Sequence, residues 1–285
     1  MDLTTARTGK CLRTSALVAA TALFVALSLA GVALSADIPI ATIGVGDSPA
    51  AIAVNPISHK VYVANFYGDT VSVIDGATDS NVATIPMPGV PSIPVPNAVV
   101  VNAISTPARA YVANWQSHKI SFIDESTLTK TATITVPASN GSGNPRSLAL
   151  WATSTPPKLY VANYHRNSVS VLNAETGATI AEIPVGASPR TLAMFTADSR
   201  KRLYVANRYS DNVSIIDMQT DSVVATAATG AAPKAFAVDQ ATGHVFVTSS
   251  SSDLVTVIDD TDSVIANIAV GDNPLGIAIE EGSGR

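Results

Sequence analysis

Three basic residues occupy the same place in three consecutive stretches of the chain. Arg146, Arg190 and Lys234 each follow a proline directly and lie 44 residues apart. The corresponding residues of the two earlier stretches, Ala50 and Asn97, are uncharged. Basic side chains that converge can hold a carboxylate or a phosphate group. We therefore predict a binding site for an anionic ligand, or for a protein partner, where these three side chains meet.

Aromatic side chains gather at a second recurring place, in short polar loops. Aromatic residues make up only 5% of the chain, so composition alone does not explain so many in equivalent loops. An aromatic rim around cations suits an anionic partner, or single-stranded nucleic acid through base stacking. In the alternative interpretation, the arginines pair with nearby acids and the rings cover loop backbone. The residues of this second group are Phe66, Tyr67, Trp115, Tyr164, His165, Arg208 and Tyr209.

The other reactive residues give little indication of catalysis. His118 and His165 lie in equivalent loops, but no pair of carboxylates completes a metal-ligand set by its spacing. Asp259, Asp260 and Asp262 lack the glycine and the terminal glutamate of a calcium-binding loop. The sequence contains no Gly-x-Ser-x-Gly nucleophile elbow, no phosphate-binding glycine loop and no Cys-x-x-Cys-His haem motif. We predict no catalytic residue, no metal ligand and no cofactor.

A repeated tetrapeptide places these residues in register. Its intervals are 49, 49, 44 and 42 residues, and each unit contains four short runs rich in β-branched residues, separated by turn residues. Four short antiparallel strands repeated at this period are typical of a β-propeller blade. The sequence therefore predicts an all-β propeller. The copies are Tyr62-Val-Ala-Asn65, Tyr111-Val-Ala-Asn114, Tyr160-Val-Ala-Asn163, Tyr204-Val-Ala-Asn207 and the degenerate Phe246-Val-Thr-Ser249.

The motif and the run Val-Ser-Val-Ile-Asp at 71–75 resemble the YVTN β-propeller repeat family, over about residues 38–279. The resemblance implies an exported or cell-surface propeller, in a family that commonly has seven blades. Similar propellers include lactone hydrolases, which hold a divalent metal in the central channel through acidic and amide side chains. Asn163, Asn207 and Asp211 are the candidates for that role here, although the neighbouring cations would repel a metal.

The number of blades follows only partly from the repeat. Five complete units run from Ala50 to about Pro274. Residues 38–45 match only the last strand of a unit, and residues 276–279 match only a first strand. Three closures are consistent with this count: a partial sixth blade shared by the two terminal strands, a five-bladed ring with spare strands, or closure by forming a dimer.

Residues 1–36 are predicted to be a signal peptide, which leaves 37–285 as the propeller domain. Basic residues precede the uncharged run 16–34, and Ala33 and Ser35 are small residues suited to signal-peptidase cleavage. If the run is retained, its length suffices for a membrane anchor, which would be the only membrane contact. Either outcome predicts an exported domain that is periplasmic, on the cell surface or secreted.

Composition narrows the possible functions. The only cysteine, Cys11, lies in the predicted signal peptide, so the remaining chain has no disulfide, thiol nucleophile or thiolate metal site. Without Arg7, Lys10, Arg13 and Asp2 the chain has 14 basic and 21 acidic residues, a net charge of −7, and nucleic acid is not an expected partner. We expect a non-catalytic binding or scaffold protein of the cell envelope. The alternatives are a metal-dependent lactonase-like hydrolase and single-stranded nucleic-acid binding.

Overall fold

A computed structural model describes residues 41–87, 95–136 and 143–280, in which every regular element is a β-strand. No helix long and apolar enough to cross a membrane occurs in these ranges, and the predicted signal peptide lies outside them. The strands are β1 (Pro49–Val54), β2 (Lys60–Asn65), β3 (Thr70–Asp75), β4 (Ser80–Pro86), β5 (Pro96–Asn102), β6 (Arg109–Asn114), β7 (Lys119–Asp124), β8 (Thr129–Thr135), β9 (Pro145–Trp151), β10 (Lys158–Asn163), β11 (Ser168–Asn173), β12 (Thr179–Pro184), β13 (Pro189–Phe195), β14 (Arg202–Asn207), β15 (Asn212–Asp217), β16 (Ser222–Ala228), β17 (Pro233–Val238), β18 (Val245–Ser249), β19 (Leu254–Ile258) and β20 (Val264–Ala269).

The strands form five separate sheets of four, and each sheet follows the order of the chain. We number these sheets blades 1 to 5, from β1–β4 to β17–β20. Short turns join consecutive strands, so each strand pairs antiparallel with its neighbour. Asp75 and its counterparts accept backbone N–H groups in the turn after the third strand. The prediction of five complete four-stranded repeats is confirmed.

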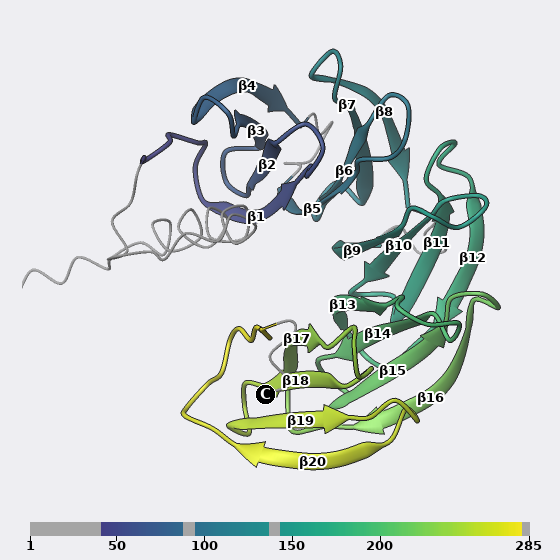
Figure 1. Ribbon diagram of the computed structural model, residues 1–285. Coiled ribbons are helices and arrows are strands. Elements are labelled where there is room, and N and C mark those ends of the chain that lie inside the picture. Colours follow the sequence, from purple (N-terminus) through teal and green to yellow (C-terminus); the bar gives the residue numbers. More distant parts are fainter. Residues whose placement is uncertain (1–40, 88–94, 137–142, 281–285) are drawn as a thin grey trace, which may run out of the picture.

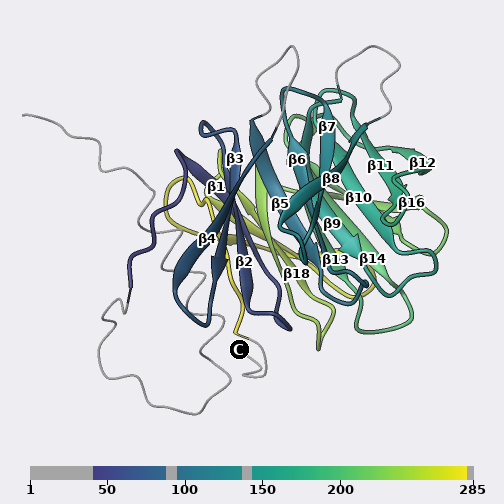
Figure 2. The same ribbon diagram turned by 90° about the horizontal axis from the view of Figure 1, so that it is seen from above.

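The blades stand around a centre and form an open ring (Figure 1). Their innermost strands β1, β5, β9, β13 and β17 pack in sequence along the inside, and strands such as β2, β5 and β6 cross the thickness of the ring (Figure 2). Four apolar clusters lie between consecutive blades, one at each of the four interfaces. Because one twisted sheet cannot bury both of its faces alone, each blade depends on its neighbours.

The motif tyrosines connect each blade to the next. Their side chains are at most 1% exposed, because the rings pack in the apolar clusters between blades. Each hydroxyl also donates a hydrogen bond to the following blade, to an acceptor near the turn between its third and fourth strands. Burial, followed by nearby carboxylates, raises the pKa of Tyr62 and Tyr160 well above the ordinary range. The bonds run from Tyr62 to Glu125 Oε2 (3.0 Å), from Tyr111 to the Ala174 carbonyl (2.9 Å), from Tyr160 to Asp221 Oδ1 (3.0 Å) and from Tyr204 to Asp262 Oδ1 (3.5 Å).

The predicted terminal strands do not form within the described residues. Residues 41–48 and 271–280 belong to no strand, so the partial sixth blade is absent there and the ring stays open between blade 5 and blade 1 (Figure 1). A first-strand and a last-strand sequence need two middle strands between them for pairing. No described residues supply those middle strands at this position.

Candidate functional site

A β-bulge at the start of every innermost strand determines where the side chains of the predicted basic residues point. In blade 3, Asn163 pairs with Pro145 and Ala162 pairs with Ser147, which leaves Arg146 as an extra residue. The same shift follows the first proline of the innermost strand in the other four blades. A bulge turns a side chain away from the regular alternation of the strand. The extra residues in those blades are Ala50, Asn97, Arg190 and Lys234.

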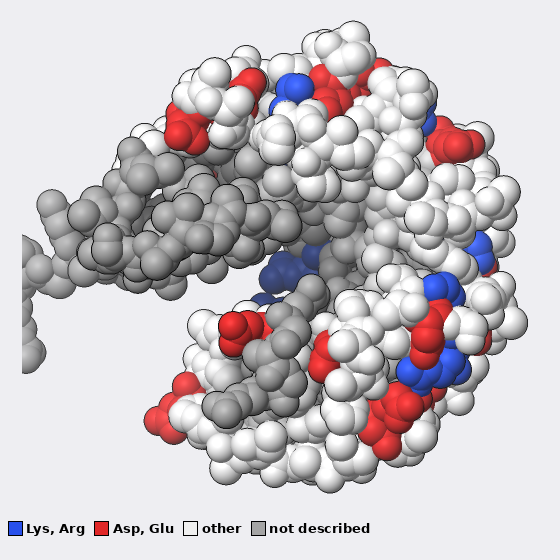
Figure 3. All heavy atoms as spheres, viewed as in Figure 1, with Lys and Arg blue, Asp and Glu red and all other residues white. Residues whose placement is uncertain are grey.

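The cations of blades 3, 4 and 5 lie close enough to repel one another. We call Arg146, Arg190, Arg208 and Lys234 the basic cluster. Burial lowers the pKa of Arg146, Arg190 and Lys234, and the charge of a neighbouring arginine is the next largest cause in each case. Lys and Arg atoms are visible deep in the central hollow of the ring, whereas the acidic groups on this face lie on the blades around it (Figure 3).

The basic cluster has no acidic partner among the described residues. Basic residues elsewhere form the ion pairs of that part of the chain, and each of those pairs lies outside the cluster. The alternative interpretation, in which Arg146 and Arg190 pair with local acids, is therefore not what the structure shows. The basic residues that do form ion pairs are Lys158, Arg166, Arg200 and Arg202.

Aromatic rings take the place of carboxylates beside two of the arginines. The guanidinium carbon of Arg146 lies 4.8 Å from the ring centroid of Trp115, and that of Arg208 lies 5.2 Å from the ring centroid of Tyr209. Arg208 Nη1 also donates to the Tyr164 hydroxyl at 3.4 Å. A ring face stabilises a cation without occupying its N–H groups. Most donors of the cluster therefore remain available to a ligand.

A pocket of about 180 Å³ lies between these groups, lined by Trp115, Arg146, Tyr164, Arg190 and Arg208. Tyr164 is only 8% exposed. Burial favours a higher pKa for its phenol, but hydrogen bonds from Tyr209 and Arg208 outweigh burial and lower that pKa. The pocket thus offers guanidinium N–H groups, the Tyr164 hydroxyl and the indole of Trp115.

The structure brings together eight of the ten predicted site residues. His165 joins the group through ring contacts with Trp115 and Tyr164, at centroid distances of 5.8 and 5.1 Å. Phe66 and Tyr67 instead form an edge-to-face pair with each other on blade 1, with centroids 5.0 Å apart. The described residues show no ring contact between that pair and the others. Among the described residues, the predicted rim is therefore an arc over blades 2 to 4.

Sequence reasoning missed the polar side chains that fix the bulges. Asn97 Nδ2 donates to the Arg146 carbonyl at 3.1 Å, and Thr191 Oγ1 donates to the Lys234 carbonyl at 2.7 Å. Both bonds join the innermost strand of one blade to the bulge of the next. Asn97 occupies the bulge position, so the repeat pattern of the sequence was sufficient to single out its amide. Thr191 is one residue beyond the bulge, where the sequence shows no recurring feature.

The residues predicted as possible ligands of a channel metal form hydrogen bonds within the propeller. Asn163 Nδ2 donates to Ser170 Oγ at 2.7 Å, and Asn207 Nδ2 donates to Ser214 Oγ at 2.9 Å. Asp211 Oδ1 accepts the Ala232 N–H at 2.9 Å. Over residues 41–87, 95–136 and 143–280, no three His, Cys, Asp or Glu side chains gather as a metal site would require. The Oδ1 atoms of Asn163 and Asn207 are buried with no hydrogen-bond partner among the described residues, so the lactonase-like alternative stays a prediction.

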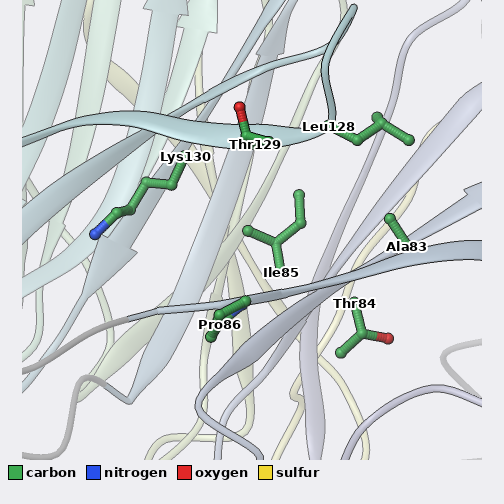
Figure 4. Close-up of a pocket in the computed structure, with 7 residues that line it drawn as sticks. All are labelled: Ala83, Thr84, Ile85, Pro86, Leu128, Thr129 and Lys130. Carbon is green, nitrogen blue, oxygen red and sulfur yellow. The ribbon is translucent and has the colours of Figure 1, made fainter.

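A larger hollow lies at the outer edge of the ring, between β4 and β8 (Figure 4). It measures about 300 Å³, and its lining is mostly aliphatic. Its only charged residue, Lys130, extends away from the other labelled side chains (Figure 4). No set of polar groups converges there, so this hollow lacks the features that would orient a ligand. The lining residues are Ala83, Thr84, Ile85, Pro86, Leu128, Thr129 and Lys130.

Comparison with known proteins supports the same fold. A family model described as a YNCE-like beta-propeller matches residues 182–285. No curated protein matches the sequence. The predicted propeller fold is confirmed, whereas membership of the YVTN repeat family stays a prediction.

Solved structures resemble the chain over most of its length. A streptogramin B lyase is similar with a TM-score of 0.65 and 13% identity, over 82% of this chain and 74% of the lyase. Virginiamycin B lyase from Staphylococcus aureus gives a TM-score of 0.66 and 14% identity, over 83% of this chain and 75% of the lyase. Hydrazine synthase from Kuenenia stuttgartiensis gives 0.56 and 14%, over 86% of this chain and 93% of the other. At these identities the similarity shows the fold alone.

Proposed function

We propose that this chain is a non-catalytic, exported propeller of the cell envelope that binds an anionic ligand, or an anionic group of a protein partner, at the basic cluster. One observation supports the proposal most strongly. Four cations from three consecutive blades share a partly buried site, and no acid among the described residues neutralises them. Such an arrangement costs free energy in the unliganded protein. A bound anion removes that cost.

The pocket geometry favours a single carboxylate or phosphate group. Guanidinium groups bind such oxyanions through two parallel N–H bonds, and Arg146, Arg190 and Arg208 all line the pocket. The Tyr164 hydroxyl can donate a further hydrogen bond. Tyr209 is 66% exposed, so it can cover the part of a ligand that projects from the pocket. The resemblance of the repeat to exported YVTN propellers supports the proposed location.

The two alternative functions have less support. A divalent metal in the channel would lie near the basic cluster, where like charges repel it. Single-stranded nucleic acid needs a basic groove along which successive bases stack on rings. Here the converging rings span only blades 2 to 4, and Phe66 and Tyr67 lie apart from them. Electrostatic attraction to nucleic acid is also opposed by the net negative charge of the chain.

Calorimetric titration with inorganic phosphate and with succinate tests the proposal. We expect saturable binding of at least one of the two anions by the parent protein. The double variant Arg146→Glu and Arg190→Glu should lose that binding without a fall in its melting temperature. Lys60→Glu, on blade 1 and outside the basic cluster, is the matched control and should bind as the parent does. The proposal is wrong if neither anion binds, or if the double variant binds as well as Lys60→Glu.

A further inference from the structure

The turn conformation that leads from one blade to the next occurs six times in the described residues, although these residues form five blades. Each turn places a non-glycine residue with positive φ directly before a proline. Residues other than glycine seldom adopt this conformation, so its recurrence marks one shared geometry. The φ values lie between 45° and 57°, and the residues are Ser48, Val95, Asn144, Ser188, Ala232 and Asn273.

Each complete turn is held by hydrogen bonds from the blades on both sides. The Ser188 N–H donates to Asn167 Oδ1 of blade 3 at 2.9 Å, and its carbonyl accepts the Arg208 N–H of blade 4 at 3.1 Å. The turn after blade 5 has the first bond, from the Asn273 N–H to Asp253 Oδ1 at 2.8 Å. In the described residues it has no counterpart of the second.

Among the described residues, the turn before blade 1 has the second of these hydrogen bonds but not the first. The Ser48 carbonyl accepts the Phe66 N–H at 2.8 Å, but within the described ranges no side chain of a preceding blade accepts the Ser48 N–H. The Gly46 N–H contacts Ser72 Oγ at 3.3 Å, as the Gly186 N–H contacts Ser214 Oγ at 3.4 Å in blade 4. The chain therefore enters blade 1 as if another blade came before it.

The residues after Asn273 repeat the pattern of an innermost strand. Leu275-Gly-Ile-Ala-Ile279 aligns with Arg190-Thr-Leu-Ala-Met194. The third residue of this pattern packs between blades at Leu148 and Leu192. Ile277 is its equivalent, but residues 275–279 pair with no strand. They have the sequence of an innermost strand directly after blade 5, but they form no strand among the described residues.

The gap-facing side of blade 1 also lacks its usual cover. Ile52 and Val61 occupy the positions that Leu192 and Leu203 hold in blade 4. The leucines are buried in the cluster between blades 3 and 4, whereas Ile52 and Val61 are only partly buried. The gap-facing side of blade 1 therefore continues the type of apolar interface that joins the other blades.

We propose that the gap receives a β-hairpin from a partner chain, which supplies the second and third strands of a sixth blade. In every blade two strands separate the innermost strand from the outermost one. A hairpin would pair its first strand with the N–H and C=O groups of residues 275–279, which pair with no strand among the described residues. Its alternating apolar side chains would cover both gap-facing sheets. A second copy of the chain is a poorer fit, because its middle strands are already paired within their own blades.

A peptide copied from the chain tests this proposal. Residues 158–173, which form the β10–β11 hairpin, are made as a fluorescently labelled peptide and added to the full chain. We expect saturable binding by fluorescence anisotropy and a higher melting temperature of the protein, with no effect from a peptide of the same composition in scrambled order. Ile277→Lys should weaken peptide binding at least about tenfold, which corresponds to about 1.4 kcal/mol.

Val224→Lys is the matched control, since Val224 is an exposed apolar residue of β16, and it should bind the peptide as the parent does. The melting temperature of each variant without peptide shows whether its fold is intact. The proposal is overturned if the scrambled peptide binds equally, if Ile277→Lys binds as the control does, or if light scattering shows a dimer that the peptide does not dissociate. The last result would assign the gap to a second copy. Anion binding does not enter any of these measurements.

Discussion

At the scale of single residues, the bulge position shows that the fold does not require a cation there. Ala50 and Asn97 occupy the same bulge in blades 1 and 2 as Arg146, Arg190 and Lys234 occupy in blades 3 to 5. An uncharged side chain therefore satisfies the backbone geometry. The cations add burial of charge and mutual repulsion, both of which oppose folding. A local feature that opposes stability in this way is typical of a functional site.

The titration of Lys234 tests the free-energy cost of burying these neighbouring cations. Burial, followed by the charges of Arg190, Arg208 and Arg146, lowers its pKa below the ordinary value of 10.5. Between the lowered pKa and 10.5 the unfolded chain binds more protons than the folded one, so the free energy of unfolding rises with pH there. Below that window the full cost of the charge is present. We therefore expect Lys234→Met to be more stable than the parent at neutral pH, and to lose this advantage as the pH approaches 10.5.

Urea unfolding of both proteins between pH 7 and pH 10.5 measures the difference. Lys60→Met serves as the control for removing a lysine outside the basic cluster, and its stability relative to the parent should change little over the same range. An advantage of Lys234→Met that persists unchanged at pH 10.5 would show that the gain comes from the added methionine side chain and not from relief of charge repulsion.

At the scale of elements, the motif tyrosines of blades 1 to 4 each add a buried hydrogen bond to the apolar contact between two sheets. Tyr160 donates to Asp221, which also forms an ion pair with Lys158 at 2.7 Å. Phe246 takes the tyrosine position in blade 5, the last blade along the described chain. The loss of the hydroxyl thus coincides with the absence of a following blade among the described residues.

Tyr160→Phe should therefore lower the free energy of unfolding by about 1–3 kcal/mol, because a buried bond to a carboxylate is lost. Tyr67→Phe, which removes a hydroxyl from an exposed side chain, should change it by less than about 0.5 kcal/mol. Denaturant unfolding measures both. Equal effects of the two substitutions would mean that the hydroxyl contributes nothing to the contact between blades 3 and 4.

At the scale of the whole molecule, the sequence predicted the features that recur in every blade. It did not predict the features that depend on contacts between distant parts of the chain. The strands, the blade boundaries and the register of Arg146 and Arg190 follow from a local pattern that each copy states again. The separation of Phe66 and Tyr67 from the other rings depends on how side chains of neighbouring blades meet, which no single repeat encodes. The strands predicted near the two ends do not form at residues 41–48 and 271–280, because the middle strands that would pair with them are not among the described residues.

An open ring of stacked blades should not be uniformly stable. Blade 3 packs against a neighbour on each side, while blades 1 and 5 each contribute to only one apolar cluster. In repeat architectures stability is approximately a sum of unit and interface contributions, so units with one interface open more often. We expect hydrogen exchange, measured by mass spectrometry, to be slowest for β10 and β11 and faster for β2, β3, β18 and β19. Uniform exchange across the five blades in the unliganded protein would mean that the ring is already closed in solution.

A bound hairpin peptide should slow hydrogen exchange in blades 1 and 5 and leave exchange in blade 3 unchanged, because only the end blades gain an interface.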